Sequence, residues 1–183
     1  MPQPSESVAS FIAQLDKEGN ASLKLHFPKK VVSAPKQALT KAEAAKAPTF
    51  SIAEGAAKPG QKYIIVGLDL DAPFPSFPIM SPVLHSLEVS AEVLGSAAAG
   101  WYAVQSGEVI FAYIAPGPPP GSGPHRYVFA VYEQPAGSTA ESVKKALGLG
   151  TEPSAFSRPR WDQADCETKL GLGKIVAGNY WTT

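Results

Sequence analysis

The amino-acid sequence predicts an all-β-dominated fold, an antiparallel β-sandwich with a few short peripheral helices. Three observations support this class. Short apolar runs with strand periodicity recur along the chain, whereas helical periodicity is confined to brief segments. The 16 Gly and 18 Pro residues cluster at the breaks between these runs, as turns between short strands require. Strand follows strand without long crossover helices, which favours antiparallel pairing. Residues 1–183 are expected to form one domain, because a chain of this length can bury a single sizeable core.

The first 20 residues (1–20) are expected to form an N-terminal helical segment. Apolar residues recur at helical spacing from Ser7 to Asp16, and Gly19 suits the left-handed conformation that often ends a helix. From Ala21 to Phe27, apolar and polar residues alternate, which predicts a half-buried strand.

The next part of the chain combines one predicted helix, two strands and a rigid loop. Thr40 to Glu43 has the spacing of a capping box and predicts a short surface helix that ends before Pro48. Strands are predicted over Thr49–Ala53 and Lys62–Asp71, and the second is rich in the β-branched and aromatic residues of a central strand. Four prolines between Ala72 and Pro82 exclude regular structure there.

The second half of the chain is expected to supply four further strands before its helices. A turn at Ser106–Gly107 is predicted to join the second and third of these into a hairpin. The Pro/Gly-rich run from Pro116 to Pro124 forms a second rigid loop, which leads directly into the fourth strand. The four strands are predicted over Leu84–Ser90, Trp101–Val104, Glu108–Ile114 and His125–Glu133.

Two short helices and a closing strand complete the prediction. A capping box at Ser138 to Glu141 starts the first helix and Gly148 ends it. Asp162 caps the second helix, which reaches Leu170. Lys174–Ala177 is then the last strand.

Charge and cysteine content exclude several classes of function. The 16 Lys and Arg residues balance the 16 Asp and Glu residues, so no general positive field attracts nucleic acid, and anion affinity must come from a local site. Cys166 is the only cysteine, which excludes an intrachain disulfide. The first residues lack the basic start and apolar core of a signal peptide, and no apolar run approaches the roughly 20 residues of a membrane span. These features predict a cytoplasmic protein.

Two carboxylates stand where the predicted central strand enters the proline loop. Alternation along a strand would direct Asp69 and Asp71 to the same side. Two buried acids on one wall require a basic partner or a raised pKa. The alternative is a solvated strand end with an Asx-type turn before Pro73.

Two histidines lie next to the rigid loops, each at the start of a strand. A lone histidine is more often packed than functional, but His85 and His125 lie beside turns that let backbone amides approach an anion. Prolines keep such a turn preformed and so reduce the entropy lost on binding. A carboxylate bonded to each imidazole would fix its tautomer and raise its pKa. The pattern therefore predicts a small anion pocket.

Several segments resemble, in order and spacing, the signature segments of the phosphatidylethanolamine-binding protein family, which includes Raf kinase inhibitor protein-like members. These segments are Asp69-Leu70-Asp71-Ala72-Pro73, Leu84-His85, Gly117 to Tyr127 and Val131-Tyr132-Glu133-Gln134. The resemblance extends from Leu23 to Tyr180. It implies a β-sandwich with a small cavity for phosphate, phosphoethanolamine or similar anions, without catalytic turnover, cofactor or metal. The pocket residues that it implies are Asp69, Asp71, Pro73, His85, Gly117, Pro118, His125 and Tyr127.

The sequence departs from the family pattern around the implied pocket. Leu70 stands where the family has proline, Phe74 where it has serine or arginine, and Val83 where it has an aromatic residue. The chain also ends at Thr183, without the C-terminal helix of animal relatives, so a compact form with a more open pocket mouth is expected. Strand alternation places Arg126 on the face opposite His125, in a structural role.

Three classes of function remain open from the sequence. The first is a noncatalytic binding or regulatory protein for a phosphate-containing small molecule, lipid headgroup or phosphorylated ligand, with a kinase or protease as protein partner. The second is inhibition of a serine carboxypeptidase through surface loops, as the resemblance to fungal relatives permits. The third is hydrolysis, with Ser76, Ser81 or Ser122 as nucleophile, although no Gly-x-Ser-x-Gly motif is present. Two Asp and two His could also suit zinc, but their spacing matches no metal-ligand motif.

Overall fold

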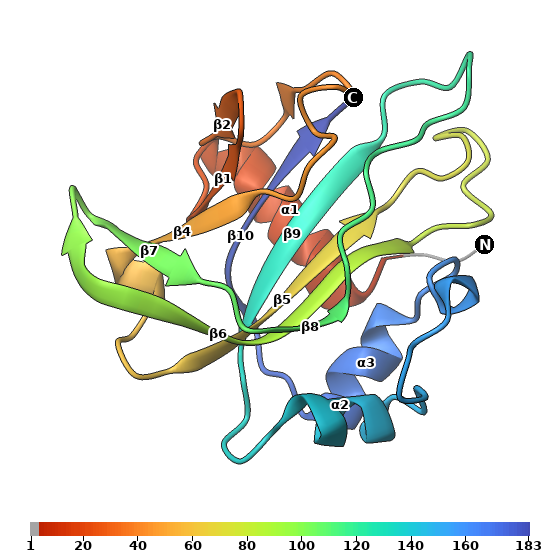
Figure 1. Ribbon diagram of the computed structural model, residues 1–183. Helices are drawn as coiled ribbons and strands as arrows, with labels where there is room; N and C mark the ends of the chain where they lie inside the picture. The colour runs from red at the N-terminus through yellow and green to blue at the C-terminus, as the bar shows by residue number, and fades with distance from the viewer. Residues whose placement is uncertain (1–3) are drawn as a thin grey trace.

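The computed structural model describes residues 4–183 and shows a strongly curled sheet with helices at its periphery (Figure 1). The described residues form ten strands, three α-helices and two 3-10 helices, η1 (Glu54–Ala56) and η2 (Ala155–Ser157). The α-helices are α1 (Glu6–Glu18), α2 (Ala140–Ala146) and α3 (Gln163–Leu170). The strands are β1 (Leu23–Phe27), β2 (Lys30–Val32), β3 (Gln37–Ala38), β4 (Thr49–Ala53), β5 (Lys62–Asp69), β6 (Val83–Ala98), β7 (Trp101–Gln105), β8 (Glu108–Phe111), β9 (Arg126–Glu133) and β10 (Ile175–Thr182).

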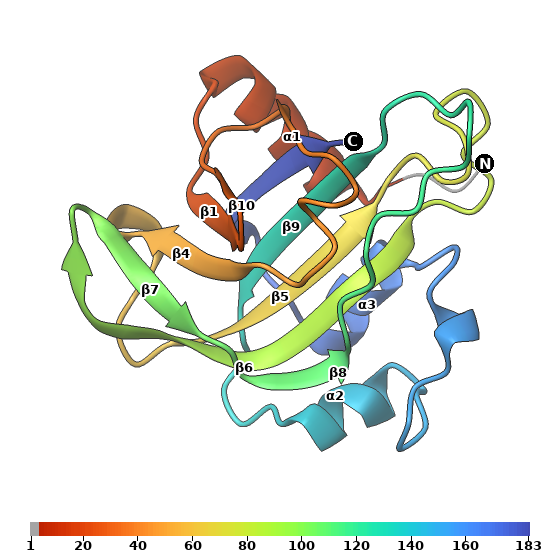
Figure 2. The same cartoon turned by 45° about the horizontal axis from the view of Figure 1, so that its top comes forward.

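The strands are hydrogen-bonded in the order β2-β1-β4-β7-β6-β5-β9-β10-β3, and β8 pairs with β6 beside this path. All pairs are antiparallel except β3 with β10. The sheet has two halves, one made of β2, β1, β4 and β7 and the other of β5, β9, β10 and β3. The 16-residue strand β6 joins them, because it pairs with β5 over its first part and with β7 over its second. The halves curl towards each other until β1 contacts β10 (Figure 2). The predicted β-dominated, mainly antiparallel fold class is confirmed.

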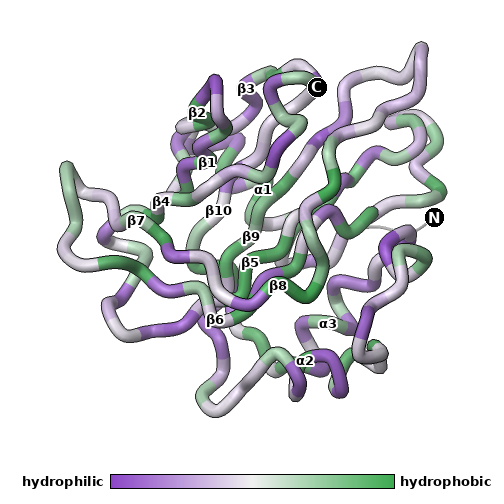
Figure 3. Tube along the Cα trace, viewed as in Figure 1, coloured by the Kyte–Doolittle hydropathy of each residue, from purple (hydrophilic) through white to green (hydrophobic). Residues whose placement is uncertain are grey.

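Two apolar clusters lie on opposite faces of β5 and β9. Ile64 and Val66 of β5 face the cluster that includes α1, α2 and α3, whereas Tyr63 and Ile65 face the cluster between the halves of the sheet. Figure 3 shows the resulting concentration of hydrophobic residues along these central strands. Burial on both faces explains why β5 appears in the sequence as a continuous apolar run.

Helices α1 and α3 begin and end at the predicted signals, whereas the C-cap of α2 is Leu147, one residue before the predicted Gly148. The Ser5 hydroxyl accepts the Val8 N–H at 3.4 Å, and Gly19 with φ 69° ends α1. Asp162 caps α3 as predicted, while the cap of α2 is Thr139, one residue later than predicted. The first three residues of the expected N-terminal helical segment lie outside the described residues. Within residues 4–183 no helix is long and apolar enough to cross a bilayer.

The helix predicted from Thr40 to Pro48 is wrong. The two capping-box hydrogen bonds do form: the Thr40 hydroxyl accepts the Glu43 N–H at 3.2 Å, and the Glu43 carboxylate accepts the Thr40 N–H at 2.8 Å. They close one turn that does not continue, since a helical nucleus is costly and Pro48 stops propagation after a few residues.

The predicted hairpin around Ser106–Gly107 is also wrong. Strand β7 pairs with β4 and β6, and β8 pairs with β6 rather than with β7. Gly107 lies against the backbone of β6, where an added Cβ would lie 1.9 Å from the Val89 carbonyl oxygen. This glycine therefore permits a close approach between segments and does not form the turn of a hairpin.

Candidate functional site

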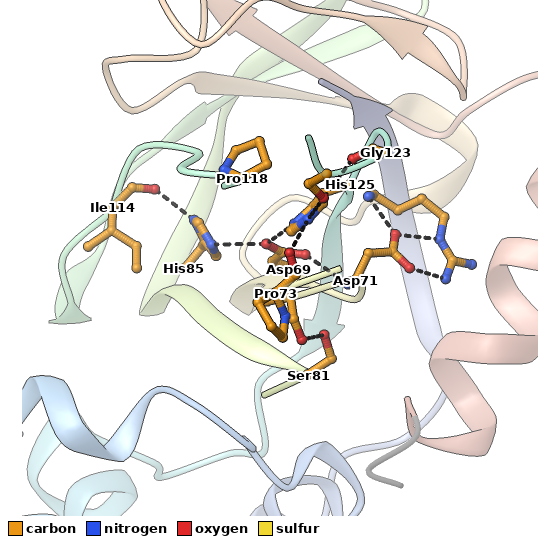
Figure 4. A network of polar contacts seen from close by, with 12 residues as sticks. Asp69, Asp71, Pro73, Ser81, His85, Ile114, Pro118, Gly123 and His125 are labelled. Atoms are coloured by element: carbon orange, nitrogen blue, oxygen red, sulfur yellow. Dashed lines mark hydrogen bonds and ion pairs between the residues drawn. The ribbon is translucent and has the colours of Figure 1, made fainter. Parts of the chain in front are cut away.

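The predicted site residues gather where three neighbouring strands end or begin. Asp69 ends β5, and the strand register pairs it with Tyr127 of β9 on one side and with the start of β6 on the other. His85 follows that start by two residues, and His125 immediately precedes β9. The four residues are 1–6% exposed: Asp69 4%, His85 6%, His125 1% and Tyr127 1%. Figure 4 shows Asp69 between the two imidazoles.

His125 is held on both ring nitrogens. Its Nδ1 lies 2.8 Å from Asp69 Oδ2, and its Nε2 lies 2.8 Å from Ser122 Oγ and 3.2 Å from the Pro73 carbonyl oxygen. Burial disfavours a charge on His125, but the hydrogen bond and negative charge of Asp69 outweigh it and raise the pKa of this imidazole. Because both Asp69 and the Pro73 carbonyl only accept, the contacts fit an imidazolium that donates from both nitrogens.

His85 has the opposite protonation preference. Its Nδ1 lies 2.8 Å from the Ile114 carbonyl oxygen and must donate to it, while Nε2 lies 4.0 Å from Asp69 Oδ2, beyond hydrogen-bond distance. Burial lowers the pKa of His85 and outweighs the opposing effects of the Ile114 carbonyl and Asp69. The neutral ring, with its proton fixed on Nδ1, therefore leaves Nε2 unprotonated beside the carboxylate.

The Tyr127 hydroxyl is buried without a hydrogen-bond partner among the described residues. The Tyr127 ring lies near both imidazoles: its centroid is 5.1 Å from that of His85, edge to face, and 6.2 Å from that of His125, stacked. Burial raises the pKa of Tyr127, as do the negative charge of Asp69 and a contact with its carboxylate that falls outside hydrogen-bond geometry, so the hydroxyl stays protonated. An unused O–H donor thus lies beside the two histidines.

Asp71 does not share the wall formed by Asp69, so the prediction from strand alternation is wrong. Strand β5 ends at Asp69, and the Asp71 carboxylate instead accepts from Arg126 through its backbone N–H at 2.8 Å, Nε at 2.9 Å and Nη2 at 2.7 Å. The Asp71 N–H donates to Asp69 Oδ1 at 2.8 Å, which is the Asx-type contact that the sequence left open. Each acid nevertheless has a basic partner, and Arg126 has a structural role in this pair.

The Pro/Gly loop closes the cluster from solvent. Pro118 is buried and lies between the two imidazoles in the view of Figure 4, whereas Gly117 is exposed. Lys41 Nζ donates to the Pro118 carbonyl oxygen at 2.6 Å and ties this loop to the turn before β4. The cluster residues are buried in this structure, and a mouth more open than in animal relatives stays a prediction. The sequence offered no signal for Lys41, because the contact joins residues 77 positions apart.

Hydrogen bonds connect Ser122 to His125 and His125 to Asp69, as in a Ser-His-Asp catalytic triad. The direction of the hydrogen bond between Ser122 and His125, however, is not the one that activates a serine nucleophile. The Ser122 hydroxyl donates to the Gly123 carbonyl oxygen at 3.0 Å and accepts from His125 Nε2. A general base would need a free lone pair on that nitrogen. Within residues 4–183 no group of three or more His, Cys, Asp or Glu residues is arranged to hold a metal ion.

Comparison with known proteins agrees with this architecture. A family model described as phosphatidylethanolamine-binding protein matches residues 29–181. The carboxypeptidase Y inhibitor of Saccharomyces cerevisiae is 28% identical in an alignment of 137 positions that covers 65% of this chain and 58% of the inhibitor. A 26 kDa secreted antigen of Toxocara canis is 28% identical over 143 residues, 78% of this chain and 48% of the antigen. The chain thus spans about half the length of these curated relatives.

Solved structures share the whole fold at low sequence identity. The carboxypeptidase Y inhibitor, crystallised with its cognate proteinase, has a TM-score of 0.70 and 22% identity, with 100% of this chain and 96% of that chain covered. A phosphatidylethanolamine-binding protein from Plasmodium vivax has a TM-score of 0.62 and 16% identity, with 100% and 98% covered.

Proposed function

The chain belongs to the phosphatidylethanolamine-binding protein family, and we propose that it is a noncatalytic binding protein whose buried cluster of Asp69, His85, His125 and Tyr127 takes up a phosphate-type anion. Pro73, Gly117 and Pro118 contribute as the loops around this cluster. Its cytoplasmic location and a kinase partner stay predictions.

The unsatisfied Tyr127 hydroxyl is the observation that carries the proposal. Buried polar groups are nearly always hydrogen-bonded, and an unpaired one costs about 1–3 kcal/mol. The Tyr127 O–H and the Nε2 of His85 are two unused polar atoms beside one carboxylate. An anion oxygen could accept from the hydroxyl directly and from Nε2 once that nitrogen is protonated. The loop that carries Pro118 and Ser122 would have to move to admit it.

Charge balance requires a proton on His85 when the anion binds. Asp69 and the protonated His125 already neutralise each other, so an added anion would face an unprotonated Nε2 and a nearby carboxylate. Protonation of His85 removes this repulsion and adds a charge-assisted donor. Binding is therefore coupled to uptake of a proton, and affinity increases as the pH falls.

We propose binding without catalysis because two candidate nucleophiles, Ser122 and Cys166, are not activated. His125 Nε2 donates to Ser122 and Pro73, so it is unavailable as a base for the Ser122 hydroxyl. The thiol of Cys166 is buried, and burial raises its pKa to about 12, which suppresses the reactive thiolate.

Titration with sulfate tests the proposal, since the charge of sulfate is constant between pH 5 and pH 8. We expect the dissociation constant to decrease as the pH is lowered, by up to about tenfold per pH unit for uptake of one proton. Calorimetry gives the affinity, and histidine NMR shifts report the site. His85→Gln should remove the pH dependence, whereas His26→Gln, outside the cluster, should preserve it. Sulfate binding that is equal at pH 6 and pH 8 in the unmodified protein would contradict the proposal.

Further probes separate the sources of the anion. Inorganic phosphate, phosphoethanolamine, vesicles that contain phosphatidylethanolamine, and a phosphoserine peptide share the anionic group but differ in what surrounds it. The order of their affinities at one pH identifies the ligand class for this chain.

Protease inhibition is a second candidate, favoured by the similarity to the carboxypeptidase Y inhibitor. The proline loop between β5 and β6 presents Phe77, which is 56% exposed, for contact with a partner. Removal of the N-terminal helix is a poor test, because Val8, Ile12 and Leu15 belong to the core.

We expect the full chain to inhibit carboxypeptidase Y in a peptide-hydrolysis assay if this second candidate is correct. Phe77→Ser should weaken inhibition about tenfold or more, as expected for an aromatic anchor at an interface. Phe156→Ser, at an exposed aromatic residue outside that loop, serves as the matched control and should have no effect. Absence of inhibition up to the solubility limit of the protein excludes this candidate.

A further inference from the structure

A small cavity lies on the sheet face that carries Tyr127, near the closed anion cluster. Its volume is about 140 Å³, and its wall includes the aromatic residues Phe50, Tyr113 and Phe129 together with Glu88. Tyr127 and Phe129 are two residues apart on β9, so their side chains lie on the same face of the sheet and in the same apolar cluster. The cavity beside Phe129 is therefore two residues farther along β9 than the proposed anion site beside Tyr127.

The space around Phe129 depends on Gly67, the strand partner of both Phe129 and Ser86. A Cβ at Gly67 would lie 2.6 Å from Ser86 Oγ and 3.0 Å from the Phe129 ring. Because Gly67 has no side chain, the Ser86 hydroxyl and the Phe129 ring can lie directly over the backbone of β5 at this position. Val109, which also lines the cavity, is 59% exposed and marks the side open to solvent.

Glu88 is a half-buried carboxylate without a cationic partner. None of the ion pairs among residues 4–183 includes it. Its Oε1 accepts the Gly107 N–H at 2.6 Å, which fixes the carboxylate in the cavity wall. Burial raises the pKa of Glu88, while the Gly107 N–H and the Ser106 hydroxyl favour the charged form. A partly desolvated negative charge of this kind is stabilised by a cation.

The aromatic rings on the cavity wall are held in position. The centroids of Phe50 and Phe129 are 5.3 Å apart with an interplanar angle of 53°, and the Tyr113 hydroxyl donates to the Ala44 carbonyl oxygen at 2.7 Å. The faces of aromatic rings carry partial negative charge and attract organic cations. A metal ion would find one carboxylate here and too few other oxygen ligands.

We propose that the cavity of Phe50, Tyr113, Phe129 and Glu88 binds a small organic ammonium ion, primary or methylated. The carboxylate supplies charge complementarity, and the rings supply apolar and cation–π contact. The volume limits the ligand to a few heavy atoms, such as a free amine or the ammonium end of a larger molecule. The site is separate from the anion cluster and does not require it to be occupied.

NMR titration of the full chain with tetramethylammonium, ethylammonium and the uncharged analogue tert-butanol tests this proposal. We expect at least one ammonium ion to shift resonances of Tyr113 and Phe129 and to bind about tenfold or more tightly than tert-butanol. Equal affinity of the ions and tert-butanol would overturn the proposal, and this comparison needs no variant.

Variants then assign the charge requirement to one carboxylate. Glu88→Gln keeps an acceptor for the Gly107 N–H and should weaken ammonium binding about tenfold without affecting tert-butanol. Glu92→Gln, an exposed carboxylate of the same strand that is paired with Lys62, should leave both affinities unchanged. Unchanged ammonium binding in Glu88→Gln overturns the proposal. His85→Gln should remove the pH response to sulfate and leave ammonium binding intact, so the two proposals fail separately.

Discussion

Replacement of Asp69 by Asn is expected to lower the free energy of unfolding by about 2–3 kcal/mol at pH 6, and by about half of that or less at pH 8. Asp69 raises the pKa of His125 in the folded protein. A raised folded-state pKa contributes stability that is fully present below the ordinary histidine pKa of about 6.5. That contribution is lost as the pH rises through the folded-state value. The single asparagine oxygen can still accept from His125 Nδ1, but the asparagine NH2 group then faces the Asp71 N–H, so the hydrogen bond from that N–H is lost at every pH.

Urea unfolding at pH 6, 7 and 8 measures this effect. Asp165→Asn provides the control, because it removes one carboxylate from the exposed pair with Lys169. Such a pair contributes at most about 0.5 kcal/mol, with little change across this pH range. If the loss of stability in Asp69→Asn is the same at all three pH values, or larger at pH 8, then Asp69 does not raise the pKa of His125.

Replacement of Trp181 by Ala is expected to cost about 3–5 kcal/mol of stability, a large fraction of the total for an ordinary domain. Trp181 is 1% exposed, and its ring stacks on Tyr127 at 5.2 Å and on Phe129 at 5.7 Å. Phe27 contacts it edge to face at 5.1 Å. Loss of this indole would leave a cavity beneath the two aromatic residues that link the proposed anion and ammonium sites.

Trp181→Phe is the matched variant for this prediction. It retains an aromatic ring, and it removes the indole N–H, which is buried without a hydrogen-bond partner among the described residues. We expect a cost below about 2 kcal/mol, because relief of an unsatisfied donor offsets part of the lost packing. Circular dichroism during denaturant unfolding measures both variants. Equal losses in Trp181→Ala and Trp181→Phe would contradict the assigned role of ring packing.

Local signals predicted the parts of the fold whose determinants lie close together in sequence. The apolar spacing and Gly19 placed α1, Asp162 placed α3, and the continuous apolar run of β5 indicated a central strand. In these segments the hydrogen-bonding and burial requirements of the chain are satisfied within a few residues. The two histidines that lie near Asp69 in the structure were also singled out from the sequence, because they follow loops with an unusual composition.

Features that depend on distant contacts could not be predicted in this way. The direction of the Asp71 side chain depends on the point at which β5 ends and on the position of Arg126, 55 residues later. Gly107 has the local pattern of a turn, but its close contact with β6 appears only when the sheet is assembled. The position of the loop over Asp69, His85 and His125 likewise depends on Lys41, which donates to the Pro118 carbonyl oxygen 77 residues later in the sequence.

A crystal structure of the protein grown at pH 6 and soaked in sulfate would show directly whether the buried cluster takes up an anion. We expect a sulfate ion within hydrogen-bond distance of Tyr127 Oη and His85 Nε2, with the Ser122 loop displaced and the bond between His125 and Asp69 intact. A soaked structure in which the Tyr127 hydroxyl still lacks a partner, and sulfate binds only to surface lysines, would contradict the proposal.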